Sequence, residues 1–329
     1  MNLNSPILVA GAGGFIGGWL VKDLLSRGFT DIRGVDKKPL HEWYQIHVGV
    51  ENHVLDLSLL EKCQEAMRGR KIIYNLAADM GGMGFIENNK ALCMLSVFIN
   101  THLLSCAIIE KVELFFFASS ACIYNQSMQQ NTENSGLREV DAYPADPEDG
   151  YGWEKLFSER MCRHFMEDFG LNVRIARFHN VYGPFGTWDG GREKAPAAIC
   201  RKIAQAKINS ETSIEVWGDG NQTRSFTYIS DAIFGINALM KSDYYKPINI
   251  GSDRLISVNG LVDIVQTISG IKVDRTYNLL APKGVRGRNS DNSLIKEKLG
   301  WAPDHDLVDG LKSTYDWIHT QILAGKESL

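Results

Sequence analysis

Two short segments carry side chains that could perform acid–base chemistry. The segment SSACIY contains Ser119, Ser120 and Cys122, and the segment YGWEK separates Tyr151 from Lys155 by four residues. Residues i and i+4 lie on one face of a helix, so a lysine ammonium there would favour the phenolate and lower the tyrosine pKa. Tyrosine needs this help because its pKa starts near roughly 10. The pair predicts a base that moves a hydroxyl proton, with Ser119 or Ser120 hydrogen-bonded to the same oxygen.

Cys122 allows two interpretations. It follows a run of apolar residues, where a cysteine more often serves as packing. If the segment stays extended, however, Ser120, Cys122 and Tyr124 share one face, and a Ser120 that faces a substrate brings the thiol with it. A thiol pKa of about 8.5 leaves a few per cent as thiolate at neutral pH, so the cysteine could also act as a base.

A glycine-rich turn near the N-terminus predicts a dinucleotide site. The segment PILVAGAGGFIGGWLVKDLLSRG has the pattern of a strand, a turn and a helix. Gly11 permits the tight turn, Gly14 lets the backbone approach a diphosphate, and Gly17 lets the helix pack closely on the strand. The free N–H groups of the helix N-terminus favour a bound diphosphate. The strand before the turn and the helix after it are the context that such a site requires.

The second strand, DIRGVDKK, predicts which dinucleotide binds. It ends in Asp36, about 20 residues beyond the glycines, where a carboxylate accepts hydrogen bonds from the adenosine ribose and repels a 2′-phosphate. We therefore expect NAD rather than NADP, although Lys37 and Lys38 could soften this preference. The residues predicted to contact NAD are Gly11, Gly14, Phe15, Ile16, Gly17, Asp36, Asp56, Leu57, Ala77, Ala78, Tyr151 and Lys155.

Alternating strands and helices predict the fold class. Further strands are expected in HVLDL, KIIYNLAA, ELFFFASSACIY and VRIARFHNVYG, with helices near 58–68, 88–111 and 151–169. Because the strands are apolar almost throughout, they indicate a parallel sheet covered on both faces. The carboxyl ends of such strands, where SSACIY lies, form the ligand edge of the sheet.

The whole chain excludes several classes of protein. It has 329 residues and a net charge of −4, with no basic stretch that would favour nucleic acid. We expect no apolar run near the roughly 20 residues of a membrane span, and hence no membrane partner. The N-terminus lacks the pattern of a signal peptide, so a cytoplasmic location is expected. The six cysteines have no metal-ligand spacing, so no metal site is predicted and free thiols are expected.

Together these motifs resemble the extended short-chain dehydrogenase/reductase family over essentially the whole chain. The resemblance implies that Ser120, Tyr151 and Lys155 form a hydride-transfer triad. It also implies a doubly wound Rossmann-type α/β fold with a smaller C-terminal α/β domain for a nucleotide diphosphate sugar. The expected NAD-binding domain comprises residues 1–180 and about 226–252, and the expected sugar-nucleotide domain comprises about 181–225 and 253–329.

Longer segments resemble one group within that family, the GDP-mannose 3,5-epimerases. They are AADMGGMGFI, SSACIY, RFHNVYGPFGTWDGGREKAPAA, WGDGNQTRSFTYI and GVRGRNSDN. The resemblance implies that Cys122 and Lys194 are the epimerising acid–base pair, and it also implies a homodimer formed through the helices at 88–111 and 151–169.

Inversion of a sugar carbon explains why such a pair would be needed. Oxidation at C4 makes the hydrogens at C3 and C5 acidic, after which a base and an acid on opposite faces invert each carbon and C4 is reduced again. Lysine is mostly protonated at neutral pH, so we expect Cys122 to be the base and Lys194 the acid.

The substrate needs groups for its diphosphate and its sugar. Guanidinium groups suit phosphate, and Arg288 is a further candidate in the same loop as Arg286. His179 is expected to be structural. The predicted substrate-binding residues are Gly81, Gly82, Ser120, Ala121, Cys122, Asn180, Glu193, Lys194, Ala195, Lys202, Gln222, Arg224 and Arg286.

Other readings of the sequence remain open. A GDP-fucose-synthase-like enzyme also has a cysteine two residues after the serine but ends with net reduction by NADPH, which Asp36 and the GGREKAP segment disfavour. A 4,6-dehydratase would have Asp-Glu where Ala121 and Cys122 stand, and a simple 4-epimerase would need neither Cys122 nor Lys194. A non-catalytic sugar-nucleotide-binding protein would be expected to lose these residues. The sugar could also be a modified GDP-sugar such as a heptose.

Overall fold

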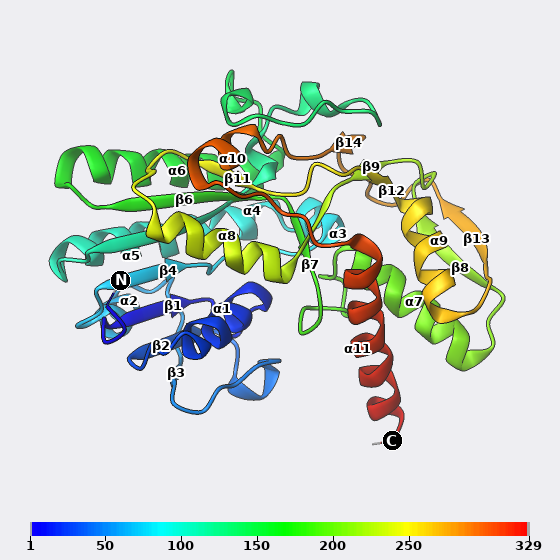
Figure 1. The fold of residues 1–329 in the computed structure, drawn as a ribbon, viewed down its shortest axis with the longest axis horizontal. Coiled ribbons are helices and arrows are strands. Elements are labelled where there is room, and N and C mark those ends of the chain that lie inside the picture. The colour runs from blue at the N-terminus through cyan, green and yellow to red at the C-terminus, as the bar shows by residue number, and fades with distance from the viewer. Residues whose placement is uncertain (1, 328–329) are drawn as a thin grey trace.

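The computed structural model describes residues 2–327. Its centre is a seven-stranded parallel sheet in the order β11-β6-β5-β4-β1-β2-β3, shown in Figure 1. The direction of winding reverses between β1 and β4, so the predicted Rossmann-type doubly wound sheet is confirmed. The strands are β1 (Ile7–Ala10), β2 (Ile32–Asp36), β3 (Glu51–Val54), β4 (Ile72–Asn75), β5 (Leu114–Ser120), β6 (Val173–Phe178) and β11 (Ile248–Ile250).

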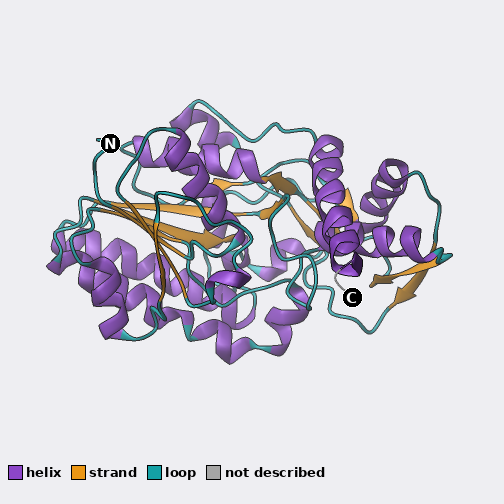
Figure 2. Cartoon of the chain, turned by 90° about the horizontal axis from the view of Figure 1, so that it is seen from below, coloured by secondary structure: helices purple, strands orange, loops and turns teal. Residues whose placement is uncertain are grey.

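Helices cover both faces of the large sheet, and Figure 2 shows the strands between two helical layers. Two helices, α1 (Phe15–Ser26) and α8 (Ile229–Lys241), share one apolar cluster with inward side chains of the strands. On the other face lie α2 (Leu60–Met67), α5 (Ser96–Ile109) and α6 (Asp149–Phe169). Burial on both faces explains why the strands read as continuous apolar runs in the sequence.

The helical stretch Lys90–Ile109 corrects one expectation. It comprises α4 (Lys90–Met94) and α5 and is long and apolar enough, by length and composition, to cross a membrane. The expectation that the chain holds no such run was therefore wrong. Core helices pass the same test, and here the stretch packs against α2 and α6. This packing accounts for the buried part of the stretch, whereas Leu92, Leu95 and Phe98 remain exposed.

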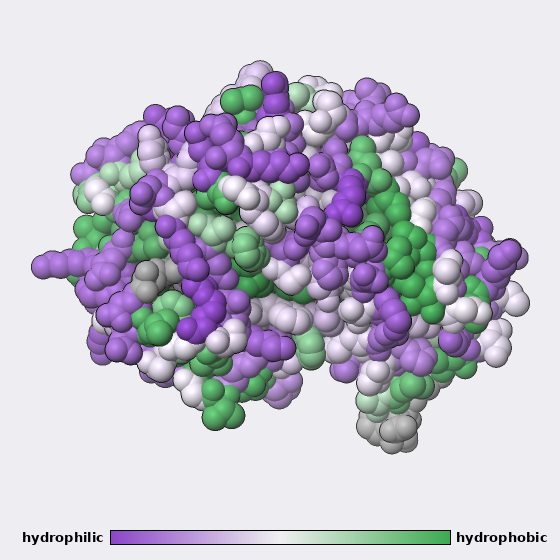
Figure 3. All heavy atoms as spheres, viewed as in Figure 1, coloured by the Kyte–Doolittle hydropathy of each residue, from purple (hydrophilic) through white to green (hydrophobic). Residues whose placement is uncertain are grey.

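A second group of elements packs beside the carboxyl end of the large sheet. The helices α7 (Ala195–Asn209), α9 (Val258–Ser269) and α11 (Leu307–Glu327) share an apolar cluster with the strand β8 (Ser213–Trp217). The strand β13 (Asp274–Asn278) pairs in parallel with β8. The segment from α8 to β11 rejoins the large sheet between α7 and α9 in sequence. The predicted domain boundaries remain predictions. Polar side chains cover most of the face in Figure 3, and its outline is indented between the large sheet and the end of α11.

Short elements connect the two groups. The helices are α3 (Met83–Asn88) and α10 (Ser293–Leu299), and the strands are β7 (Asn180–Tyr182), β9 (Thr223–Arg224), β10 (Phe226–Tyr228), β12 (Ile256–Ser257) and β14 (Gly287–Arg288). The parallel pair of β14 and β9 brings the GVRGR segment beside residues 223–224, far away in the sequence. This pairing carries arginines toward the end of β5.

Candidate active site

A cavity of about 570 Å³ lies at the carboxyl ends of the strands in the large sheet. All twelve residues that were predicted to contact NAD line it: Gly11, Gly14, Phe15, Ile16, Gly17, Asp36, Asp56, Leu57, Ala77, Ala78, Tyr151 and Lys155. Gly81, Ser120 and Lys194 line the same cavity. The structure therefore gathers the predicted cofactor residues and part of the predicted catalytic set in one place.

The glycine turn has the geometry that a diphosphate needs. Gly11 has a φ of +86°, a conformation that favours glycine. A Cβ on Gly17 would lie 2.0 Å from the carbonyl oxygen of Gly11, so only glycine fits between strand and helix. Gly14 is the N-cap of α1 and brings no side chain to occupy the first N–H groups of the helix. These N–H groups fit a bound dinucleotide diphosphate.

The two lysines after Asp36 are already engaged by the protein. Lys37 Nζ lies 2.6 Å from Asp79 Oδ2, and Lys38 Nζ donates to the carbonyl of Gly13 at 2.5 Å. Because both ammonium groups already have partners in the protein, neither is free to bind a 2′-phosphate. The Asp36 carboxylate accepts the backbone N–H of Lys38, so its turn is fixed beside the cavity.

The two serines at the end of β5 have different environments. Ser119 is buried, and its hydroxyl donates to Glu159 Oε1 at 2.5 Å, on the α6 side of the sheet. Ser120 lines the cavity, and its oxygen accepts the backbone N–H of Cys122. Ser119 also contributes to the cavity wall, but its hydroxyl is engaged by Glu159, so Ser120 is the serine that can reach a ligand.

Tyr151 and Lys155 lie on one face of α6, as their spacing predicts. The ammonium of Lys155 lies 5.7 Å from the Tyr151 ring centroid and 3.6 Å from Glu154 Oε2, and both charged side chains are buried. The expectation of a lowered tyrosine pKa is wrong. Burial, and then the nearby Cys122, raise the pKa of Tyr151 well above its usual value, and a hydrogen bond from Ser120 opposes them only partly. The lysine ammonium lies over the Tyr151 ring.

Cys122 reaches the site by a different path from the one predicted. The strand does not continue to Tyr124. It ends at Ser120 and is followed by the 3-10 helix η2 (Ala121–Ile123), because the Ser120 oxygen caps the N–H of Cys122. The shared face inferred from an extended strand was therefore wrong. The turn still leaves Cys122 in a buried cluster with Tyr151, next to the cavity.

The pKa directions of Cys122 and Lys194 oppose the roles expected for them. Burial, followed by the charge of Glu148, raises the pKa of the Cys122 thiol. Burial lowers the pKa of Lys194; Cys122 opposes this shift, and the charge of Arg288 adds to it. The surroundings thus favour the protonated form of Cys122 and the deprotonated form of Lys194, relative to the ordinary pKa values of these groups.

Arginines that were predicted to bind phosphate have protein partners here. Arg286 makes a two-pronged ion pair with Asp219, at 2.8 and 2.9 Å. Arg224 is partly buried and donates to backbone carbonyls, and burial, together with neighbouring Arg288, lowers its pKa to about 10. Lys202 donates to the carbonyl of Glu215. Their roles as substrate ligands remain predictions, and they would require an exchange of partners for Arg286.

The other predicted substrate residues surround the loop before α7. A Cβ on Gly82 would lie 2.3 Å from the carbonyl oxygen of Glu193. The absence of a side chain on Gly82 therefore makes room for the backbone of Glu193 and not for a sugar. Glu193 accepts from Arg201 and from the N–H of Gly191, which orders the loop that carries Lys194. Ala195 begins α7, and Ala121 is buried away with Tyr124. Asn180 donates to the carbonyl of Ser225, and Gln222 donates to that of Trp217.

Sequence reasoning missed the groups that surround the thiol. Arg288, expected at a phosphate, donates from Nη1 to Cys122 Sγ at 3.5 Å and from Nε to Gln129 Oε1 at 2.5 Å. Glu148 Oε2 lies 2.8 Å from Arg288 Nη2, and both side chains are buried. The only sequence signal was the position of Glu148 just before the YGWEK helix. His179 is buried, and burial lowers its pKa to about 3, consistent with a structural role.

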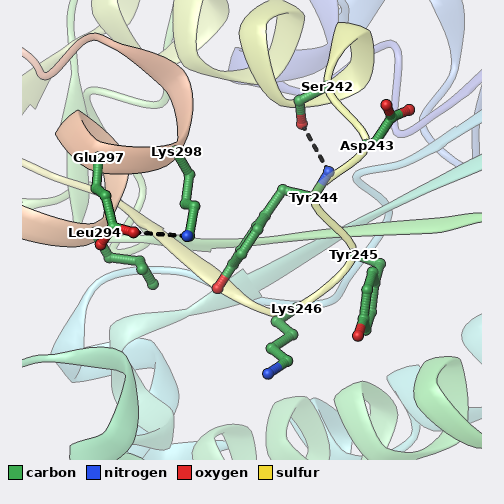
Figure 4. Close-up of a pocket in the computed structure, with 8 residues that line it drawn as sticks. All are labelled: Ser242, Asp243, Tyr244, Tyr245, Lys246, Leu294, Glu297 and Lys298. Atoms are coloured by element: carbon green, nitrogen blue, oxygen red, sulfur yellow. Dashed lines mark hydrogen bonds and ion pairs between the residues drawn. The ribbon is translucent and has the colours of Figure 1, made fainter.

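A second hollow lies far from these groups. It is lined by residues 242–246, between α8 and β11, and by side chains of α10, as Figure 4 shows. It sits at the amino end of β11, opposite the ligand edge of the sheet. Glu297 and Lys298 pair with each other there at 2.6 Å. Its position provides no route to the catalytic groups.

The chain was then compared with known proteins. The model of the NAD dependent epimerase/dehydratase family matches residues 7–251. A GDP-mannose 3,5-epimerase of Arabidopsis thaliana is 48% identical over 97% of this chain and 83% of its own length. GDP-mannose 3,5-epimerase 1 of Oryza sativa subsp. japonica is 49% identical over 96% of this chain and 82% of its own length.

A solved structure supports the fold independently. The UDP-glucose 4-epimerase of Thermotoga maritima, crystallised with UDP-glucose, superposes with a TM-score of 0.86 at 23% identity. The match covers 96% of this chain and 99% of that one. The likeness therefore extends through both groups of elements.

Proposed function

The chain belongs to the NAD-dependent epimerase/dehydratase family, and from that membership we propose that it inverts C3 and C5 of GDP-mannose. The product is GDP-L-galactose, or GDP-L-gulose where C5 alone is inverted. The observation that carries the proposal is the presence of a thiol and an amine, Cys122 and Lys194, beside the Tyr151 and Lys155 pair. A plain 4-epimerase has no use for two further proton-transfer groups.

The first task of the protein is proton transfer at the C4 hydroxyl. Tyr151 takes that proton as phenolate, Ser120 donates a hydrogen bond to the same oxygen, and Lys155 provides positive charge from below the ring. NAD, when bound, supplies the hydride acceptor and returns the hydride to C4 at the end. The raised pKa of Tyr151 makes the charge of the bound nicotinamide and of Lys155 important for forming the phenolate.

The second task is inversion of carbons beside the C4 ketone. One group removes a proton from one face of the ring, and the other returns a proton to the opposite face. In mannopyranose the hydrogens at C3 and C5 project from the same face, so the same base must serve at both carbons. We assign Cys122 as this base and Lys194 as the acid. After the first inversion the pair holds a thiol and a neutral amine, and it has to be reset before the second.

The directions of the pKa shifts suit the state after the first inversion, with a protonated Cys122 and a deprotonated Lys194, better than the state before it. They favour the protonated form of Cys122 and weaken the hold of Lys194 on its proton. The thiolate therefore depends on nearby positive charge, which Arg288 supplies. The reverse assignment would place Lys194 on the ring face from which the C3 and C5 hydrogens leave, and it would give the same product.

The decisive experiment follows solvent deuterium into the sugar. The enzyme is incubated with GDP-mannose in D₂O, and the C3 and C5 positions are followed by NMR. We expect label at inverted carbons without net consumption of NAD(H). Stoichiometric consumption of NADPH would instead support a GDP-fucose-synthase-like reductase. Parallel samples with UDP-sugars and with a GDP-heptose test the base and the sugar, and a lack of label in every sample would overturn the proposal.

We also propose that the enzyme is a homodimer. The helices α5 and α6 pack side by side on one face of the sheet and expose large apolar side chains to solvent. These are Leu92, Leu95, Phe98, Trp153 and Phe157, from α4, α5 and α6. Light scattering should give twice the mass of the chain, and Phe98→Asp with Phe157→Asp should give the mass of one chain. A monomeric wild-type protein would refute this proposal.

A further inference from the structure

Glu148 occupies a position that none of the chemistry above uses. It is buried just before α6, and its backbone N–H donates to the carbonyl of Cys122 at 2.9 Å. The next residue, Asp149, has a φ of +44°, which L residues rarely adopt, so the chain turns sharply there. The turn directs the Glu148 carboxylate toward the thiol end of the site while α6 carries Tyr151 along its first turn.

Arg288 connects this carboxylate to the thiol. Its Nη2 lies 2.8 Å from Glu148 Oε2, and its Nη1 donates to Cys122 Sγ at 3.5 Å. Gln129 accepts from the third nitrogen, Nε, so the guanidinium is held on three sides. All of these side chains are buried, where charges act with little screening by water. The guanidinium therefore divides its charge between a carboxylate and a sulfur.

The contact between Glu148 and Arg288 is an ion pair rather than an aligned hydrogen bond. Within the described chain, neither Glu148 Oε2 nor Arg288 Nη2 has a hydrogen-bond partner of acceptable geometry, although the two atoms are 2.8 Å apart. The carboxylate is thus positioned by charge and remains able to act on the thiol. Burial would raise the pKa of Glu148, but Arg288 and the thiol of Cys122 lower it overall. Glu148 is therefore an anion beside the sulfur.

Other charged and titratable groups also face the thiol, from every neighbouring element. They are Arg288 and Arg224 from the paired strands β14 and β9, Glu148 and Tyr151 from the start of α6, Lys194 from the loop before α7, and Cys93 from α4. Glu148 is the one carboxylate among these groups. Its removal leaves only cations among the charged groups around the thiol.

We propose that Glu148 is a positioning residue for Cys122, which by pairing with Arg288 withholds positive charge from the thiol and so sets the pH at which it becomes a base. Glu148 acts on the thiol through its pairing with Arg288 and through its own negative charge. With the pair intact, less of the guanidinium charge acts on the sulfur, so the thiol is favoured over the reactive thiolate. This inference deepens the epimerase proposal, but its first test does not depend on that proposal.

The test is a pH titration of the Cys122 thiolate in NAD⁺-saturated enzyme without sugar. The ultraviolet absorbance of the thiolate is read as the difference between each protein and its Cys122→Ser counterpart. Glu148→Gln should lower the midpoint by about one pH unit, equal to roughly tenfold more thiolate at a fixed pH below it. Arg288→Gln should raise the midpoint, because the cation is lost. Glu148→Asp should restore a midpoint close to that of the wild type.

Glu159→Gln provides a matched control. Glu159 is a buried carboxylate on the same helix and pairs with buried Arg177 at 2.7 Å. Its loss should cost stability as the loss of Glu148 does, without moving the Cys122 midpoint. An unchanged or raised midpoint in Glu148→Gln, or shifts of Glu148→Gln and Arg288→Gln in the same direction, would overturn the proposal. A shift of equal size in Glu159→Gln would do the same.

The catalytic readout separates this inference from the proposed function. If both hold, the acid limb of the pH profile for deuterium incorporation moves to lower pH in Glu148→Gln, because the base is formed earlier. If GDP-mannose is not the substrate, deuterium incorporation is absent in every variant. The midpoint of the thiolate titration is still lower in Glu148→Gln and higher in Arg288→Gln than in the wild type. The two failures therefore give different results.

Discussion

Arg192 Nη1 lies 2.7 Å from Asp79 Oδ1, and this contact joins the loop before α7 to the end of β4. The other oxygen of the same carboxylate lies 2.6 Å from Lys37 Nζ, at the end of β2. Although burial opposes it, the two cations lower the pKa of Asp79 overall. All three side chains line the cavity, so the carboxylate links three chain segments across the place where the cofactor binds.

Asp79→Asn should weaken retention of NAD. The substitution leaves Lys37 and Arg192 without their shared anion, so the loop before α7 is held less firmly over the cavity. Because both cations are partly exposed, we expect only a modest effect, up to about fivefold in the NAD dissociation rate. Stopped-flow fluorescence of bound NADH measures that rate. Asp316→Asn, which removes an exposed ion pair on α11, serves as the control and should change nothing.

Cys122→Ala should separate oxidation from inversion. Deuterium incorporation at C3 and C5 should fall by about 10²–10⁴, because one proton-transfer group is lost. Binding of NAD and transient oxidation at C4 should persist, since Tyr151 and Lys155 remain. Cys162→Ala, which changes a buried cysteine farther along α6, should retain turnover with some loss of stability. Full turnover in Cys122→Ala would remove the thiol from the mechanism.

Tyr151→Phe should abolish both processes together. Without the phenol, the C4 proton has no acceptor, no ketone forms, and the hydrogens at C3 and C5 stay unreactive. NADH absorbance during a single turnover and deuterium incorporation should both disappear, while binding of NAD persists. The contrast with Cys122→Ala assigns the order of events. Residual incorporation with no NADH signal in Tyr151→Phe would contradict that order.

Lys194→Met should reduce epimerisation and raise the stability of the folded protein. The lowered pKa of Lys194 means that the unfolded chain binds this proton more tightly than the folded protein does. The free energy of unfolding is therefore reduced by this residue below the lowered pKa and recovers as pH rises toward the ordinary value of about 10.4. At neutral pH, methionine should raise the melting temperature and reduce epimerisation. Lys312→Met, on the exposed face of α11, should change neither.

Gly17→Ala should destroy the cofactor site. The added Cβ would lie 2.0 Å from the carbonyl oxygen of Gly11, a backbone atom that cannot move without opening the turn. NAD binding measured by calorimetry should be lost, with a lower melting temperature. Gly325→Ala is the control, because its Cβ meets no atom within 4 Å, and alanine there should stabilise α11 by about 0.5–1 kcal/mol. Normal NAD binding by Gly17→Ala would show that the turn is not the diphosphate site.

Much of the fold was readable from local patterns. The glycine turn is confirmed in position because Gly11 and Gly17 meet steric demands that act within one strand–turn–helix unit. The β2 strand ends at Asp36, as the sequence indicated. The β3 strand lies slightly earlier than HVLDL, because Leu55 and Leu57 turn inward after pairing with β2 has ended. The local sequence pattern therefore predicts whether an element is a helix or a strand better than it predicts the residues at which the element begins and ends.

The sequence by itself determined which groups are available: the glycine turn, Asp36, the Tyr151 and Lys155 pair, Cys122 and Lys194. Their chemistry follows from residue type and spacing. Only the tertiary structure decided that Arg288, expected at a phosphate, lies against Cys122 and that Glu148 neutralises it. The physical reason is that proton affinity depends on burial and on charges brought close by folding. Residues 148 and 288 are separated by much of the chain and meet only when β14 pairs with β9 beside the start of α6.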